Sequence, residues 1–153
     1  MTPEILARLA EGAADEVALD AIPYGAYLGA SLLREEDRIL LRLRFDPGQI
    51  GAPGRLHGGV IGAALEFAAM GELMWRGLRS GAPLAHLPKP ISLTVDFLRG
   101  GRPVDTYAAA SIIRRGRRVA SVRASAWQGD AARPIAEGLM HFLVAGRSDA
   151  AGA

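Results

Sequence analysis

The sequence predicts a single α+β domain in which one long helix packs on a curved antiparallel β-sheet. The length of 153 residues fits one domain. One segment, from His57 to about Leu78, has the periodicity of a long helix, whereas most of the remaining chain reads as strand segments joined by short turns. Such turns favour antiparallel hairpins, and a single helix across a curved sheet buries the apolar faces of both.

The chain is predicted to begin with a helix followed by two strands. The helix is expected over residues 1–20, with Thr2 as its N-cap and Pro3 as its first residue. The two strands are expected over 25–33 and 38–45, separated by a charged turn. In the second strand, apolar residues alternate with mostly arginine, which is typical of a half-buried strand; the apolar side is Ile39, Leu41, Leu43 and Phe45.

A Gly- and Pro-rich loop at 46–54 leads into the long helix, and strands make up the rest of the domain. The helix is expected to turn one stripe inward, formed by Val60, Ala64, Leu65, Ala68 and Leu73. Strands are then expected over 91–99, 105–115, 117–128 and 134–145. Residues 146–153 are expected to form a disordered tail of the single domain.

The composition excludes several classes of function. The sequence contains no cysteine, which excludes disulfides and thiolate chemistry and suits a cytoplasmic protein. The N-terminal segment lacks the features of a signal peptide and no run is long enough for a transmembrane helix, so no membrane partner is expected. The net charge is only +2, and no basic tail or aromatic-interleaved basic stretch predicts nucleic-acid binding.

The basic residues are biased toward arginine. Of the 18 basic residues, all except Lys89 are arginine. This bias favours a phosphate-bearing ligand, because the guanidinium group binds phosphate oxygens in a forked geometry. A GC-rich genome would produce the same bias, so both explanations stand.

One carboxylate, Glu66, lies in the middle of the apolar helix, and the helix begins at His57-Gly58-Gly59. The first N–H groups of a helix have no intrahelical acceptor and carry the positive end of its dipole. Glycine lets a ligand approach this backbone closely, so the turn is a candidate oxyanion hole, with His57 as its cap. The sequence has no nucleophile elbow and no Gly-rich phosphate loop, and its histidines lack metal-ligand spacing.

A single copy of this helix does not readily supply both groups to one reaction. Gly58 and Glu66 are eight residues apart, or about 12 Å along a helix axis. Reacting atoms need to approach within roughly 3–3.5 Å. The sequence therefore predicts that two copies pair with antiparallel helices, one giving the Gly58 N–H group and the other Glu66.

The motif GRLHGG, with an acid nine positions after its histidine, resembles the PaaI-type hotdog-fold acyl-CoA thioesterases. The stretch SLTVDFLRGGRPVDTYAAASIIRRGRRVASVRASAW is similar to their later strands, and the likeness covers roughly residues 28–144. It implies a hotdog homodimer, often doubled to a homotetramer, that hydrolyses acyl-CoA thioesters without a metal or a cofactor. It further implies that Glu66 is the catalytic nucleophile or general base, that the Gly58 N–H group binds the thioester oxygen, and that His57 and Gly59 shape the turn.

The resemblance also implies substrate-binding positions. Arg99 and the hairpin residues Arg115, Gly116 and Arg117 lie where the family often meets coenzyme A. Gly51 stands where many relatives have Asn or Gln, with Gln49 as a nearby replacement. Thr94 and Ser92 are candidates for the Ser or Thr that helps the water in several relatives, because Met70 and Pro90 occupy those positions here.

Two rival functions remain open at this stage. The same fold supports enoyl-CoA hydratases and dehydratases, for which His57 would be the candidate partner of the acid. A non-catalytic acyl-CoA-binding protein is the other alternative, favoured by Gly51 and Met70. Glu66 could also be a structural residue paired with an arginine. The sequence does not indicate the acyl group.

Overall fold

The computed structural model describes residues 3–144 and confirms one long helix against an antiparallel sheet. The helices are α1 (Pro3–Ala10), α2 (Pro23–Tyr27) and α3 (Gly58–Arg79), and a 3₁₀ turn, η1, spans Pro47–Gln49. The strands are β1 (Glu16–Ala18), β2 (Ala30–Glu35), β3 (Arg38–Leu43), β4 (Ile50–Ala52), β5 (Arg55–Leu56), β6 (Lys89–Phe97), β7 (Thr106–Arg115), β8 (Val119–Trp127) and β9 (Ala136–Leu143).

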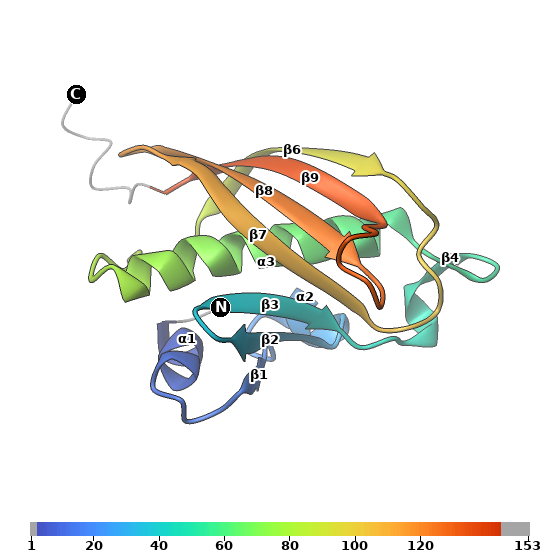
Figure 1. Cartoon of the computed structure of the whole chain (residues 1–153), viewed down its shortest axis with the longest axis horizontal. Helices are drawn as coiled ribbons and strands as arrows, with labels where there is room; N and C mark the ends of the chain where they lie inside the picture. The colour runs from blue at the N-terminus through green and yellow to red at the C-terminus, as the bar shows by residue number, and fades with distance from the viewer. Residues whose placement is uncertain (1–2, 145–153) are drawn as a thin grey trace.

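Seven of these strands form one antiparallel sheet in the order β1-β2-β3-β7-β8-β9-β6. Strands β3 and β7 are neighbours, although α3 and β6 separate them in the sequence. The sheet wraps around α3, with β6–β9 on one side of the helix and β1–β3 on the other (Figure 1). The long helix therefore occupies the hollow of the sheet.

Helix α3 is buried along most of its length. The residues expected to face inward are each at most 8% exposed; they are Val60, Ala64, Leu65, Ala68 and Leu73. Trp75 is also buried, and its indole N–H donates to the carbonyl of Asp37 at 3.0 Å. Because α1 also packs on α3, apolar residues are needed on more than one face of this helix.

The expected N-terminal helix over residues 1–20 is too long. Helix α1 ends at Ala10, because Gly12 takes a left-handed conformation at φ +70°, a common way to end a helix. Strand β1 follows, and Val17 is buried where β1 pairs with β2. The expected cap Thr2 and the expected tail 146–153 lie outside the described residues.

The strand expected over 25–33 is also partly wrong. Helix α2 occupies its first residues, and β2 begins only at Ala30, after Gly29 at φ +62°. The loop expected over 46–54 contains η1 and the first strand of the small β4–β5 hairpin. The other expected strands are confirmed to within a few residues.

Strand β6 forms one edge of the sheet, and within residues 3–144 it pairs with β9 alone. Eight of its nine residues are exposed, and Val95 is half-buried. Its exposed apolar residues include Ile91 at 58%, Leu93 at 40% and Phe97 at 57%. An open edge with large apolar side chains is typical of a surface that pairs with another chain.

Candidate active site

The N-terminus of α3 is held by its own capping histidine. The Nδ1 atom of His57 accepts a hydrogen bond from the Gly59 N–H at 2.9 Å. The backbone N–H of His57 donates to the carbonyl of Gln49 at 2.8 Å, which fixes the preceding loop. Because Nδ1 is an acceptor, the neutral ring carries its proton on Nε2. The expectation that His57 caps the turn is confirmed.

Capping satisfies Gly59 but leaves the Gly58 N–H group open. Among the described residues, this group makes no hydrogen bond. The ring of Phe97 packs beside it, since a Cβ atom built on Gly58 would lie 3.2 Å from the ring. Gly58 therefore offers a backbone donor at the positive end of a 22-residue helix, next to an apolar wall.

Glu66 lies two turns further along α3 and is partly exposed. Within residues 3–144 its carboxylate makes no hydrogen bond or ion pair. Burial raises the pKa of Glu66 above the ordinary glutamate value, because the apolar surroundings disfavour the charged form. A partly desolvated and unpaired carboxylate in a concave site is typical of a functional group.

A single pocket of about 450 Å³ is lined by both Gly58 and Glu66. Its walls come from α3, β6 and α2; the lining residues are Tyr24, Gly58, Gly59, Gly62, Ala63, Glu66, Leu93, Val95 and Phe97. Apart from Glu66, the Tyr24 hydroxyl and the backbone, this lining is apolar. Since the pocket includes three residues of the edge strand β6, a chain that pairs with this edge would lie beside it.

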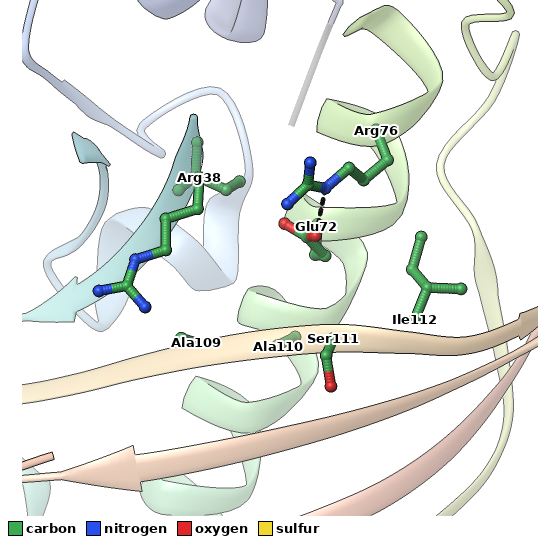
Figure 2. Close-up of a pocket in the computed structure, with 8 residues that line it drawn as sticks. Arg38, Glu72, Arg76, Ala109, Ala110, Ser111 and Ile112 are labelled. Carbon is green, nitrogen blue, oxygen red and sulfur yellow. Dashed lines mark hydrogen bonds and ion pairs between the residues drawn. The ribbon is translucent and has the colours of Figure 1, made fainter. Parts of the chain in front are cut away.

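A second acid on the same helix, Glu72, has a different environment. Strands β3 and β7 stop pairing beyond Leu41 and Ala108, which opens a cavity of about 500 Å³ between them. Glu72 lines this cavity, and its carboxylate accepts a hydrogen bond from Arg76 Nε at 2.7 Å (Figure 2). The hydrogen bond and the charge of Glu72 raise the pKa of Arg76. Glu72 is thus the acid neutralised by an arginine, whereas Glu66 is not.

Two expected substrate-binding residues support the loop instead. Gln49 is buried, and its side-chain amide donates to the carbonyls of Leu28 at 3.0 Å and Arg44 at 2.9 Å. Gly51 packs against His57, where any Cβ would lie 2.7 Å from the His57 Cα. A larger residue at Gly51 would therefore displace the His57 backbone. Neither Gln49 nor Gly51 lines the pocket of Glu66.

The remaining expected positions lie apart from Glu66. Thr94 is exposed and points to the opposite face of β6 from Leu93 and Val95, because side chains alternate along a strand. Ser92 shares the face of Thr94.

The hairpin of Arg115, Gly116 and Arg117 lies at the other end of the sheet from the Gly58 pocket. It adjoins the Lys89 end of β6, and an Arg115 Nη2 donates to the Ala82 carbonyl at 3.4 Å. Arg99, by contrast, lines a pocket together with Gly58.

The sequence patterns did not indicate several residues of the Glu66 pocket. Tyr24 belongs to a five-residue helix, for which Pro23 at the first position was the available signal. Its ring stacks on Tyr27 with centroids 6.1 Å apart and lies 6.3 Å from the ring of Phe67. Leu93 and Phe97 were expected in a strand, but nothing in their spacing placed them against Gly58.

The described part of the chain shows no sign of a metal site or a membrane span. No three His, Asp or Glu side chains within residues 3–144 are grouped so that they could hold a metal ion. None of the helices described there is long and apolar enough to cross a membrane.

Comparison with known proteins agrees with this fold. Residues 46–143 match the family model of the acyl-CoA thioesterase N-terminal domain. A crystal structure from Chromobacterium violaceum is 33% identical, with coverage of 94% of this chain and 98% of that chain and a TM-score of 0.70. No curated protein matches the sequence.

More distant structures share the fold. A Shewanella oneidensis protein related to the thioesterase superfamily is 23% identical, with 92% and 98% coverage and a TM-score of 0.70. A Bacillus halodurans protein determined with CoA is 19% identical, with 94% and 92% coverage and a TM-score of 0.66.

A long helix enclosed by one antiparallel sheet, with matches of this kind, defines a hotdog-fold protein. The family match covers well over half of the sequence, and the chain belongs to the acyl-CoA thioesterase family.

Proposed function

We propose that this protein hydrolyses acyl-CoA thioesters, with Glu66 of one subunit and the Gly58 N–H group of its partner acting on the same carbonyl. The observation that carries the proposal is the pocket in which an unpaired carboxylate and an unpaired helix N-terminal N–H share one apolar wall. Their separation of about 12 Å along α3 is too long for one thioester group, which favours a shared site.

The open edge of the sheet supports the dimer. If β6 pairs with β6 of a second copy around a two-fold axis, the two sheets become continuous and the exposed apolar residues of β6 are buried. The same axis runs the two α3 helices antiparallel. Glu66 of each copy then faces the Gly58 turn of the other.

The chemistry needs only these groups and water. Ionised Glu66 takes a proton from a water molecule that attacks the thioester carbon, or attacks that carbon itself to form an anhydride that water then opens. The carbonyl oxygen becomes an oxyanion and accepts the hydrogen bond of the Gly58 N–H group. When the carbon–sulfur bond breaks, the CoA thiolate leaves and takes up the proton. The products are the free acid and CoA.

Helix polarity helps both steps. The positive end of the partner's α3 stabilises the oxyanion and favours the ionised form of Glu66, which offsets only part of the rise in its pKa caused by burial. His57 Nδ1 is used by Gly59, which supports a role for this histidine in positioning the turn.

The test is the release of free CoA thiol from a panel of aryl, short-chain and medium-chain acyl-CoA esters. Glu66→Gln removes the charge at nearly constant shape, so we expect it to fold and dimerise normally and to lose about 10³-fold or more in kcat. Glu137→Gln, an exposed glutamate on β9, is the matched control and keeps wild-type turnover.

Three results would overturn the proposal. Unchanged hydrolysis by Glu66→Gln would remove the carboxylate from the mechanism. Tight binding of CoA esters by the wild-type protein without cleavage of any ester would identify a binding protein. Hydration of an enoyl-CoA, assayed separately beside thiol release, would identify a hydratase.

A further inference from the structure

Four arginines lie in or beside the loop that follows β6, at the same end of the sheet as Gly58. They are Arg55, Arg99, Arg102 and Arg133, and all four are exposed. None of them takes part in an ion pair with a carboxylate of residues 3–144. This contrasts with Arg38, Arg42, Arg44, Arg76 and Arg79, each of which is paired with an acid.

These arginines line two adjoining pockets. One pocket of about 410 Å³ contains Arg99, Arg102 and Arg133, with Asp130 as its acidic lining residue. The next, of about 380 Å³, contains Arg55 and Arg99 and shares Arg99 and Gly100 with the first. We call the four residues the arginine cluster.

The second pocket also leads to the candidate active site. Gly58 and Phe97 line both this pocket and the pocket of Glu66. A continuous row of three concave sites therefore runs from the carboxylate, past the Gly58 N–H group, to the arginine cluster. Phe97 and Arg102 are five residues apart, so their Cα atoms lie at most about 17 Å from each other.

The loops that carry the cluster are held by specific hydrogen bonds. The Gln128 side chain accepts from the Arg102 N–H at 2.9 Å and donates to the Arg102 carbonyl at 2.9 Å and to Thr106 Oγ1 at 2.9 Å. Arg99 Nη1 donates to the Pro134 carbonyl at 2.8 Å, and its backbone N–H donates to the Ile135 carbonyl at 3.0 Å. Ordered backbones thus present guanidinium groups that no acid neutralises.

Gly100 lets Arg55 join this arrangement. The Arg55 guanidinium lies where a side chain on Gly100 would stand, so a larger residue there would displace the end of Arg55. The backbone there leaves Arg55 and Arg99 on the walls of one pocket.

We propose that the arginine cluster binds the phosphate groups at the nucleotide end of the CoA thioester whose carbonyl lies at Gly58. This inference rests on the proposed function. Guanidinium groups bind phosphate oxygens through paired, charge-assisted hydrogen bonds, and three arginines outweigh the single charge of Asp130 in their pocket. An elongated ligand with a reactive carbonyl at one end and phosphates at the other would span this row of pockets.

The proposal assigns this role to the same subunit that gives the oxyanion donor. The hairpin of Arg115 and Arg117 lies at the opposite end of that subunit and is the rival position for phosphate binding. The two positions make different predictions for substitutions.

The experiment measures binding by calorimetry and hydrolysis in parallel. The probes are CoA, adenosine 3′,5′-bisphosphate and inorganic phosphate for binding, and an acyl-CoA and the matching acyl-N-acetylcysteamine thioester, which has no nucleotide, for hydrolysis. The double variant Arg102→Gln with Arg133→Gln tests the cluster. Arg123→Gln, an exposed arginine on β8, is the matched control.

We expect the double variant to bind CoA and adenosine 3′,5′-bisphosphate at least about tenfold more weakly than the wild type. Its KM for the acyl-CoA should rise by the same factor, with kcat unchanged. Hydrolysis of the N-acetylcysteamine thioester and all properties of Arg123→Gln stay at wild-type level. In the wild type, adenosine 3′,5′-bisphosphate competes with the acyl-CoA, a measurement that needs no variant.

Three outcomes would overturn the inference. The first is that the double variant binds CoA as tightly as the wild type. The second is that it loses hydrolysis of the acyl-CoA and of the N-acetylcysteamine thioester equally. The third is that CoA binding is lost in the variant Arg115→Gln with Arg117→Gln instead. Arginine-dependent binding of inorganic phosphate as tight as that of CoA would also contradict it. If CoA binds at the cluster but no thioester is cleaved, the proposed hydrolysis fails and the binding site stands.

Discussion

The Nδ1 atom of His57 accepts the Gly59 N–H at 2.9 Å, which satisfies one donor at the start of α3 and leaves the Gly58 N–H group free. The histidine thereby selects which backbone group can meet a ligand. Its contact with Gly51 and its backbone hydrogen bond to Gln49 hold this geometry from the other side.

If His57 acts as a helix cap, another side chain that can cap the helix should replace it. His57→Ala should lower the free energy of unfolding by about 1 kcal/mol, because the cap is lost, and His57→Asn should recover most of it. Urea unfolding of the three proteins measures this order. A normal cap in His57→Asn together with a collapse of kcat would show that the imidazole takes part in the chemistry.

Burial of Glu66 predicts a characteristic pH dependence. Since the pKa of Glu66 is raised, activity should fall on acidification at a pH above the ordinary glutamate value of about 4.3. The pH profile of kcat/KM measures this, and an acid limb at or below that value would contradict it.

The raised pKa of Glu66 also predicts that the fold loses stability as the pH rises. The loss begins as the pH passes the ordinary glutamate pKa, because ionising the buried carboxylate has a cost that the unfolded chain does not have, and it is complete above the raised pKa. Glu66→Gln should therefore be at least as stable as the wild type at pH 8, with the difference vanishing at low pH.

The Glu72–Arg76 pair predicts an asymmetry between its two members. The Glu72 side chain is 6% exposed and that of Arg76 45%. Arg76→Met leaves a buried carboxylate unpaired and should cost about 2–3 kcal/mol, whereas Glu72→Gln leaves a guanidinium that water can hydrate and should cost about 1 kcal/mol. Urea unfolding gives the order. A larger loss for Glu72→Gln, or loss of turnover in it, would contradict this assignment.

Pairing through β6 predicts that a charge on this edge separates the subunits. Ile91→Lys should weaken the dimer by about 2 kcal/mol or more, roughly thirtyfold in the dissociation constant, and reduce activity with it. Ile113→Lys is a matched control, because Ile113 is 55% exposed and Ile91 58%. Light scattering across a concentration series distinguishes the two. Equal dimerisation of both variants and the wild type would exclude β6 as the contact.

Strong periodicity explains which parts of the fold could be predicted. The long helix, its inward stripe and the later strands repeat apolar residues over many positions, and the structure confirms them. Strand β1 has three residues and α2 five, too few for a period. Val17 of β1 and Leu28, the residue that caps the C-terminal end of α2, are buried in the core and anchor these segments. Gly12, which ends α1, was a usable signal for the shorter first helix.

Only part of the candidate site, likewise, could be predicted from the sequence. Gly58 and Glu66 lie on one helix, so spacing alone related them. Tyr24 and Phe97 reach the same pocket from α2 and β6, and Arg55, Arg102 and Arg133 come from three separate loops or strands. Their proximity depends on how the sheet wraps around α3, which no local pattern encodes.

The most direct test of the shared site is complementation between two inactive variants. Glu66→Gln removes the carboxylate. Gly58→Pro removes the N–H donor at a first helical position where proline is favoured, after a residue whose φ of −65° and ψ of 135° suit it. A Cβ atom at this position lies 3.2 Å from the ring of Phe97, so a shift of that ring by a few tenths of an ångström accommodates the proline. Each variant should form a folded, inactive homodimer.

The decisive measurement is thioester hydrolysis by the purified heterodimer of these two variants. With groups drawn from opposite subunits, one of its two sites has both lesions and the other has none, so we expect about half of the wild-type activity per dimer. A heterodimer as inactive as its parents would contradict a site built from two copies.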